Sequence, residues 1–106
     1  MAGANIIQWN CRGLHANRSD LELLDQKYNP AVICLQETKS ARSLSFKGHV
    51  EYFKPGTLDA MGRAYGGVAI YVKDGLPQSN IQLQTNLQAI AIKVTLDTTF
   101  TICSLY

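Results

Sequence analysis

The sequence predicts a layered α/β fold in which a helix packs on a mixed, mostly antiparallel sheet. Up to Leu35 the signals run strand, helix, strand, and such a connection brings the chain back to the same sheet. Beyond residue 50, apolar residues recur at every second position, as they do in strands with one buried face. With 106 residues, 46% of them apolar and 17% charged, the chain suits one globular domain with a modest core.

The first element expected is a strand over residues 5–10, which are rich in β-branched and aromatic side chains and lead to Gly13. A second strand is expected over residues 31–35, an unbroken apolar run of the kind found in central strands covered on both faces. This run ends abruptly at the polar residues 36–39. We expect a ligand site where these two strands end, as in other open α/β sheets.

Residues 20–28, between these strands, have the pattern of an amphipathic helix. Ser19 and Glu22 have the spacing of a capping box, which predicts the start of the helix. Pro30 prevents the helix from continuing. The apolar residues that recur at helical spacing are Leu21, Leu24 and Tyr28.

The second half of the chain has the pattern of short strands separated by glycines. Residues 96–100 predict a hairpin connection between the last two strands. The residues expected to alternate toward a buried face are Val50 and Tyr52, then Val68, Ile70 and Val72, then Ile90, Ile92, Val94 and Leu96.

Cysteine usage and hydropathy exclude several classes of protein. Cys11, Cys34 and Cys103 are odd in number and lie among apolar neighbours, so we expect buried free thiols and neither a disulfide framework nor a zinc site. No basic segment followed by an apolar run opens the chain, and no run nears the roughly 18 apolar residues that span a bilayer. We expect an intracellular protein, nuclear or cytoplasmic, without a membrane partner.

The net charge of +2 is too small to establish a nucleic-acid partner by itself. A solvated rim is the simpler interpretation of the cations on composition alone. The cations expected in loops or at element ends, where a ligand could meet them, are Arg12, Arg18, Lys39, Arg42, Lys47 and Arg63.

Glu37 is the residue that points to chemistry, because a carboxylate directly after a buried strand would lie at the mouth of the sheet. Magnesium prefers hard oxygen ligands of this kind. Asn10 also ends a strand, and neighbouring strands would bring it beside Glu37. The sequence therefore indicates a candidate magnesium site. In the alternative interpretation these residues bind no metal: Glu37 caps its strand or pairs with Lys39, and Asn10 supports the turn.

Two ordered motifs resemble those of a known family. Residues 7–14, Ile-Gln-Trp-Asn-Cys-Arg-Gly-Leu, resemble the opening strand motif of apurinic-type endonucleases in the exonuclease/endonuclease/phosphatase superfamily. Residues 30–39, centred on Leu-Gln-Glu-Thr, resemble the second motif. Residues 65–70 and 101–106 are similar to two later strands of that superfamily. The Gln-Trp-Asn-Cys and closing Ser-Leu-Tyr segments are most similar to endonucleases of non-LTR retrotransposons.

This resemblance implies that residues 1–106 are a partial domain, the N-terminal half of a four-layer α/β/β/α sandwich. It also implies a DNA endonuclease that depends on Mg²⁺ (or Mn²⁺). In that family pattern Glu37 is the metal ligand, Asn10 supports the metal and the scissile phosphate, and Tyr106 hydrogen-bonds the phosphate. The candidates for contacts with the DNA backbone are Arg12, Lys39 and Tyr65.

Two departures from the family pattern bear on activity. Arg12 stands where many relatives carry a metal-holding aspartate, and an arginine there favours bidentate contact with a phosphodiester. The family's catalytic Asp and Asn and its Asp–His pair have no counterpart up to Tyr106, and we expect His15 and His49 to be ordinary loop or strand histidines. A missing general base alone lowers a rate by roughly 10² to 10⁴. We therefore expect a family reaction of DNA nicking but no appreciable activity from this chain, which leaves its status as an enzyme open.

A noncatalytic module is the alternative class of function. Without a second half to cover them, the strand faces at residues 68–72 and 90–96 would be exposed, and exposed apolar faces mark partner sites. The chain would then self-associate, or bind a protein or DNA. A phosphatase acting on inositol phosphates or a phospholipid hydrolase ranks lower, because the residues around Glu37 fit the DNA-cleaving branch better.

Overall fold

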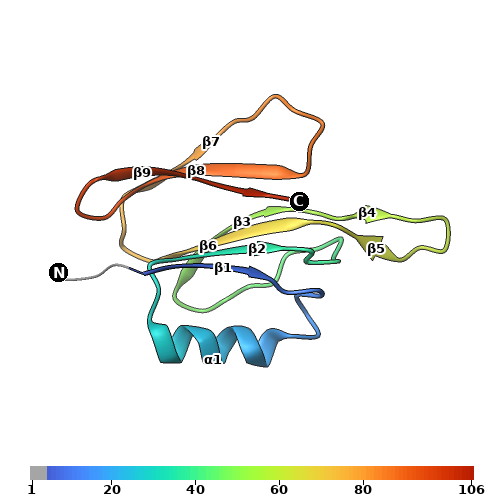
Figure 1. The fold of residues 1–106 in the computed structure, drawn as a ribbon, viewed down its shortest axis with the longest axis horizontal. Coiled ribbons are helices and arrows are strands. Elements are labelled where there is room, and N and C mark those ends of the chain that lie inside the picture. Colours follow the sequence, from blue (N-terminus) through green and yellow to red (C-terminus); the bar gives the residue numbers. More distant parts are fainter. Residues whose placement is uncertain (1–4) are drawn as a thin grey trace.

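The computed structural model describes residues 5–106, which form three layers (Figure 1). The predicted order of strand, helix and strand at the start is confirmed, and strands predominate in the rest of the chain. The elements in chain order are β1 (Ile6–Asn10), α1 (Arg18–Tyr28), β2 (Val32–Gln36), β3 (His49–Lys54), β4 (Thr57–Leu58), β5 (Ala64–Tyr65), β6 (Val68–Lys73), β7 (Gln78–Ile81), β8 (Ala89–Thr95) and β9 (Thr99–Leu105).

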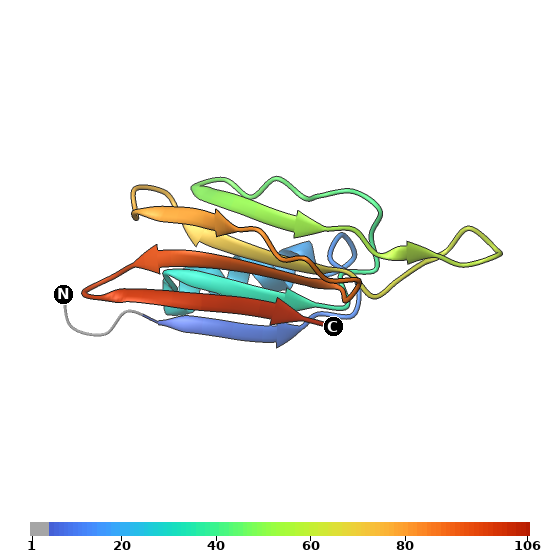
Figure 2. The same ribbon diagram turned by 90° about the horizontal axis from the view of Figure 1, so that it is seen from above.

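The layers are one helix and two sheets. The first sheet has the strand order β1-β2-β6-β3, in which β1 and β2 are parallel and the other neighbours antiparallel. The second sheet has the order β7-β8-β9 and is antiparallel, with the predicted hairpin between β8 and β9. In Figure 1, α1 covers one face of the first sheet and the second sheet covers the other, and Figure 2 shows the two sheets stacked. The predicted mixed, mostly antiparallel α/β fold is confirmed.

The helix begins earlier than predicted and does not use the predicted capping box. Its first residue is Arg18, and its N-cap residue Asn17 makes no side-chain capping hydrogen bond. The Asn17 amide instead donates to the carbonyl oxygens of Cys11 (2.8 Å) and Gly13 (3.0 Å), so it holds the loop after β1. Glu22 pairs with Arg18 at 3.2 Å. Among the described residues, no helix is long and apolar enough to cross a membrane.

Strand β2 is buried along its whole length, as its apolar run predicted. Ile33 and Leu35 pack on the helix side of the sheet, and Cys34 packs on the side of the second sheet. Burial raises the pKa of the Cys34 thiol to about 11, because a thiolate there would lose its hydration. Cys11 is also a buried free thiol, but Cys103 is exposed on the edge strand β9, so the prediction for that residue is wrong.

The predicted exposure of the apolar strand faces is wrong. Ile70 and Val72 of β6 lie in one buried cluster with Ile92 and Val94 of β8. The alternating residues of β6 and those of β8 face each other between the two sheets, so each set covers the other. Self-association through these faces therefore has no basis in the structure.

Strand β6 has two buried faces instead of the predicted one. Ala69 and Tyr71 lie on the helix side and pack in a cluster that contains Leu21 and Phe46. The Tyr71 hydroxyl donates to the Leu44 carbonyl oxygen (2.6 Å), and burial raises the pKa of this hydroxyl. Because β6 lies in the middle of the first sheet, one layer covers each of its sides.

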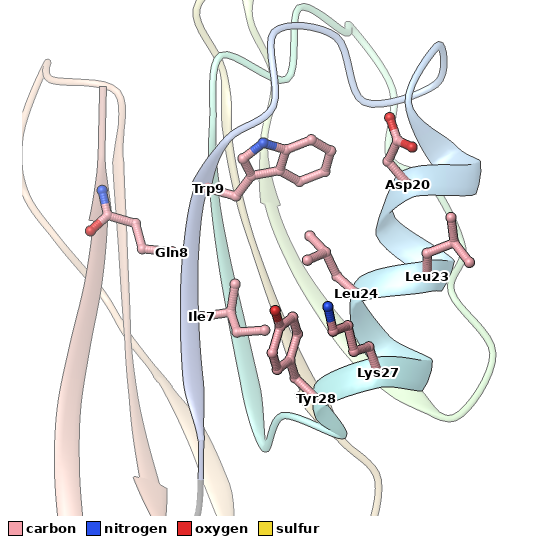
Figure 3. Close-up of a pocket in the computed structure, with 8 residues that line it drawn as sticks. All are labelled: Ile7, Gln8, Trp9, Asp20, Leu23, Leu24, Lys27 and Tyr28. Carbon is pink, nitrogen blue, oxygen red and sulfur yellow. The ribbon is translucent and has the colours of Figure 1, made fainter.

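A cavity of about 400 Å³ opens between β1 and α1 (Figure 3). Ile7 and Trp9 point toward it from β1 and Tyr28 does so from α1, whereas Gln8 points to the opposite side of the strand. The candidate site residues predicted from the sequence do not line this cavity. It is a gap in the packing of the helix, separate from the strand ends.

Candidate functional site at the strand ends

The candidate site lies where β1 and β2 end side by side. The parallel register pairs Asn10 with Gln36, the residue before Glu37. Backbone hydrogen bonds continue past both strands, from the Cys11 nitrogen to the Gln36 oxygen (3.1 Å) and from the Gly13 nitrogen to the Glu37 oxygen (2.9 Å). The structure thus brings Asn10 and Glu37 to neighbouring positions at one edge of the sheet.

Three residues at this edge have a left-handed backbone although none of them is glycine. The φ angle is 50° at Arg12, 53° at Glu37 and 50° at Lys39. A non-glycine residue in this region costs about 1–3 kcal/mol and persists only where the surrounding structure holds it. Such outliers cluster at functional sites, so the backbone strain singles out the same residues as the sequence motifs.

The Glu37 carboxylate lies 3.9 Å from the Nε atom of Arg12. The Arg12 side chain is 79% exposed and that of Glu37 is 25% exposed. At this distance and exposure the pair is loose and contributes little to stability. Among the described residues Glu37 pairs with Arg12 and not with Lys39. The ion pair between Glu37 and Lys39 that the sequence offered as an alternative to a metal site is therefore wrong. The carboxylate remains accessible to a ligand.

A glycine turn that leads into β6 holds the segment after Glu37. The backbone nitrogens of Thr38 and Lys39 donate to the carbonyl oxygens of Gly67 (3.2 Å) and Gly66 (2.8 Å). A Cβ atom at Gly67 would lie 2.3 Å from the Thr38 Oγ1 atom, which leaves no room for any side chain. Tyr65, immediately before this turn, is exposed at the same edge. The turn therefore fixes the backbone that presents Glu37.

Gln88 joins three parts of this edge, and no sequence motif indicated it. Its side-chain oxygen accepts from the Gly67 nitrogen (2.6 Å), and its amide donates to the Thr57 hydroxyl (3.0 Å). Its backbone oxygen accepts from the Tyr106 nitrogen (2.9 Å). Tyr106 is thereby placed at the same edge, with its side chain about half exposed. A polar loop residue gives no local signal, because only its contacts with distant segments define its role.

A buried polar chain links the two sheets beside the site. The Gln36 amide donates to the Ser104 hydroxyl (2.9 Å), which donates to the Leu35 carbonyl oxygen (2.9 Å). The Gln8 amide donates to the Gln36 side-chain oxygen (3.3 Å). Both Gln36 and Ser104 are buried, and buried polar groups need such partners. These bonds fix β9, and with it Tyr106, against the end of β2.

The residues at this edge fit part of a magnesium site. Among residues 5–106, no group of three or more His, Cys, Asp or Glu side chains gathers to hold a metal ion. Glu37 offers one carboxylate, and Asn10 on the adjacent strand end offers an amide oxygen. Magnesium commonly binds one or two carboxylates and completes its octahedral shell with water and substrate phosphates. One carboxylate and one amide oxygen would supply only part of such an octahedral shell.

Neither histidine adds a catalytic group to this edge. The Nε2 atom of His15 lies 2.9 Å from the Ser40 hydroxyl oxygen, where it supports the loop after Lys39. The buried His49 ring stacks on Phe46 with a centroid distance of 4.5 Å, and its Nε2 atom lies 3.2 Å from an Asp25 carboxylate oxygen. These contacts agree with the ordinary structural roles expected for both residues.

The fold and this edge define a layered α/β protein whose polar residues gather at the carboxyl ends of adjacent parallel strands, where such sheets bind ligands. The sequence of residues 7–105 matches the Endonuclease/Exonuclease/phosphatase family. The chain belongs to this family, and the resemblance seen in its motifs is confirmed. No functionally curated protein matches the chain.

Solved structures that share the fold include three enzymes that act on DNA or belong to a retrotransposon, as their names state. The endonuclease domain of TRAS1, a telomere-specific non-LTR retrotransposon, is 21% identical with a TM-score of 0.68, over 95% of this chain and 44% of its own. The AP endonuclease LMAP from Leishmania major is 22% identical with a TM-score of 0.69, over 95% and 39%. The 3′ phosphatase NExo from Neisseria, bound to a product DNA hairpin, is 19% identical with a TM-score of 0.65, over 98% and 41%. The chain therefore spans less than half the length of each of these relatives.

Proposed function

We propose that this chain carries the metal- and phosphate-facing edge of a magnesium-dependent DNA endonuclease of the non-LTR retrotransposon type. The observation that carries the proposal is the left-handed backbone of Arg12, Glu37 and Lys39, gathered where β1 and β2 end. Membership of the family and the endonuclease and DNA-bound neighbours support this choice of reaction.

Each residue at the edge has a role in this proposal. Glu37 would hold Mg²⁺ (or Mn²⁺), and the Asn10 amide would orient the metal and the scissile phosphate. The Tyr106 hydroxyl would donate a hydrogen bond to a phosphate oxygen. The residues proposed to contact the DNA backbone nearby are Arg12, Lys39 and Tyr65.

Arg12 would respond to the arrival of DNA. Its loose pairing with Glu37, at 3.9 Å, is weaker than a bidentate contact between a guanidinium group and a phosphate. Once Arg12 turns to the phosphodiester, the Glu37 carboxylate is free to bind the cation. The bound cation supplies positive charge that stabilises the phosphoryl oxygens. DNA and metal would therefore bind cooperatively at this edge.

The 106-residue polypeptide alone is proposed to bind DNA without cutting it. Hydrolysis of a phosphodiester needs a positioned water and a general base in addition to the cation. In the described part of the chain, Glu37 is assigned to the metal, while His15 and His49 are engaged elsewhere. A missing general base lowers the rate of hydrolysis by roughly 10² to 10⁴. The chain would therefore bind DNA without cutting it at an appreciable rate.

Binding and nicking assays test this proposal together. Wild-type chain is expected to bind duplex DNA more tightly in Mg²⁺ than in EDTA, and Glu37→Gln to lose that difference. Supercoiled plasmid in Mg²⁺ is expected to remain supercoiled with wild type and with Glu37→Ala. Glu22→Gln is the matched control, because Glu22 is an exposed carboxylate on α1, and its binding should equal that of wild type.

Three results would contradict the proposal. Nicking by wild type that disappears in Glu37→Ala would show that the chain completes its own catalytic site. A magnesium response that survives in Glu37→Gln, or an absence of DNA binding by wild type, would remove Glu37 from the assigned role.

A further inference from the structure

Strand β1 is an open edge of the first sheet, and no charge protects it. It pairs only with β2, and its other side has no neighbour among the described strands. The sequence of β1, Ile-Ile-Gln-Trp-Asn, contains no charged residue and no proline. The edge strand on the other side of the sheet, β3, carries Glu51 and Lys54. Proteins protect exposed edges with charges or proline, so an unprotected edge is a candidate for pairing with another strand.

The free hydrogen-bonding groups of this edge belong to Ile6, Gln8 and Asn10. Cys11, one residue past β1, donates its backbone hydrogen bond to the Gln36 oxygen at the end of β2 (3.1 Å). Alternate residues of a strand direct their backbone groups to the same neighbour, so the odd-numbered residues of β1 face β2. The backbone nitrogens and oxygens of the even-numbered residues therefore point away from the sheet.

A gap in the packing adjoins β1 on each of its faces. On the helix side lies the cavity of about 400 Å³, toward which Ile7 and Trp9 point from β1 and Tyr28 from α1 (Figure 3). On the other side a cavity of about 310 Å³ is lined by residues of β1, β2 and β9, among them Ile6 and Ile102. Ile6 and Tyr28 are each 45% exposed. A strand added to the free edge of β1 would cover both gaps.

A second copy of this chain supplies a strand that fits the edge. Two β1 strands that run antiparallel around a two-fold axis at Gln8, the middle residue, pair along their whole length. Gln8 then forms a hydrogen-bonded pair with Gln8 of the second copy, and Ile6 does so with Asn10 of the second copy. Ile7 lies opposite Trp9 of the second copy in a non-hydrogen-bonded pair, where side chains are closest and an aromatic residue favours a β-branched one. This register uses every free backbone group of the edge.

Shape and charge favour a second copy over an unrelated strand. In Figure 2, β1 and β9 lie along the same side of the molecule and β1 extends beyond β9, so a neighbour reaches β1 first. The stripe of α1 beside the helix-side cavity includes Asp20 in the first turn and Lys27 in the last. The two-fold axis makes the two helices antiparallel, so the acidic start of each lies toward the basic end of the other. Such complementarity steers the two copies into register.

We propose that two copies of this chain associate through their β1 strands, with the two-fold axis at Gln8, and join their four-stranded sheets into one. The surface is a sheet edge, distinct from the faces of β6 and β8 that cover each other within one chain. The inference does not depend on the proposed function. Because the pairing strand is short, the dimer is small in interface and dissociates on dilution.

Opposite charges placed at Gln8 test this arrangement, because the axis sets the two side chains at this position opposite each other. Sedimentation equilibrium in EDTA, without DNA, is expected to show a wild-type mass that rises with concentration to that of two chains. Gln8→Lys and Gln8→Glu are each expected to raise the dissociation constant at least about tenfold, since like charges would face each other. An equimolar mixture of the two variants is expected to restore the two-chain mass. Asn80→Lys, on the exposed edge strand β7, is the matched control and should associate as wild type does.

Any of three outcomes would overturn the dimer. They are a wild-type chain that stays monomeric at every concentration, a Gln8→Lys variant that associates as tightly as wild type, and a mixture of the two charged variants that stays monomeric. Restoration in the mixture also shows that both variants fold. The assay contains neither metal nor DNA, so its failure leaves the proposed function standing, and a failure of DNA binding leaves the dimer standing.

Discussion

Replacing Gly67 by alanine is expected to lower the free energy of unfolding by about 3 kcal/mol or more. Gly67 has a φ angle of +90°, and its Cβ atom would lie 2.3 Å from Thr38 Oγ1 and 3.0 Å from the Gly56 nitrogen. The left-handed backbone and the overpacking each cost about 1–3 kcal/mol. Because both neighbours are themselves tied to the segment after Glu37, the substitution is also expected to weaken DNA binding.

Gly75→Ala separates the two causes. Gly75 has nearly the same φ angle, +89°, but no atom lies within 4 Å of the position of its Cβ atom. It should therefore show only the backbone cost, about 1–2 kcal/mol. Urea unfolding followed by the fluorescence of Trp9, the single tryptophan, measures both variants. Equal losses in the two variants would show that the close approach at Gly67 does not matter for stability.

Truncating Ile92 to alanine is expected to destabilise the protein by about 3 kcal/mol, within the range of 2–5 kcal/mol for buried aliphatic side chains. Ile92 is fully buried between the two sheets, where it belongs to the same cluster as Ile70 and Val72. The loss combines the transfer free energy of the removed carbons with the cavity left between layers that pack from both sides.

Ile6→Ala is the matched control, because Ile6 lies on the edge strand β1 and is 45% exposed. Its expected loss is about 1 kcal/mol, since almost half of the residue stays in water on folding. Urea unfolding measures stability, and sedimentation measures the oligomeric state. An Ile92→Ala variant that keeps its stability but changes its oligomeric state would mean that this face is uncovered, contrary to the structure.

The local patterns of the sequence predicted the elements but not how the layers cover one another. The apolar run at residues 31–35 predicted β2, and Pro30 marked the boundary before it. The run at residues 68–72 is equally unbroken, yet its alternation suggested one buried face, and the structure buries both. The partners of Ile92 are distant in sequence, so no local pattern could show that the two sheets cover each other.

The site was predictable where its signals are local. Glu37 follows β2 and Asn10 is the last residue of β1, and the parallel pairing of these strands places them together. Gln88 was not predictable, because it is a polar loop residue whose importance comes from its bonds to Gly67 and Tyr106. The hairpin at residues 57–65 was also missed, since strands of two residues are too short for a periodic pattern.

Manganese ions test most directly whether Glu37 holds a divalent cation, because Mn²⁺ broadens the NMR signals of nearby nuclei. Substoichiometric Mn²⁺ is expected to broaden the backbone amide signals of residues 10–13 and 37–39 in the wild-type chain. Glu37→Gln is expected to lose this broadening, and Glu22→Gln to retain it. Broadening that persists in Glu37→Gln, or that centres on another part of the molecule, would contradict a metal site at the strand ends.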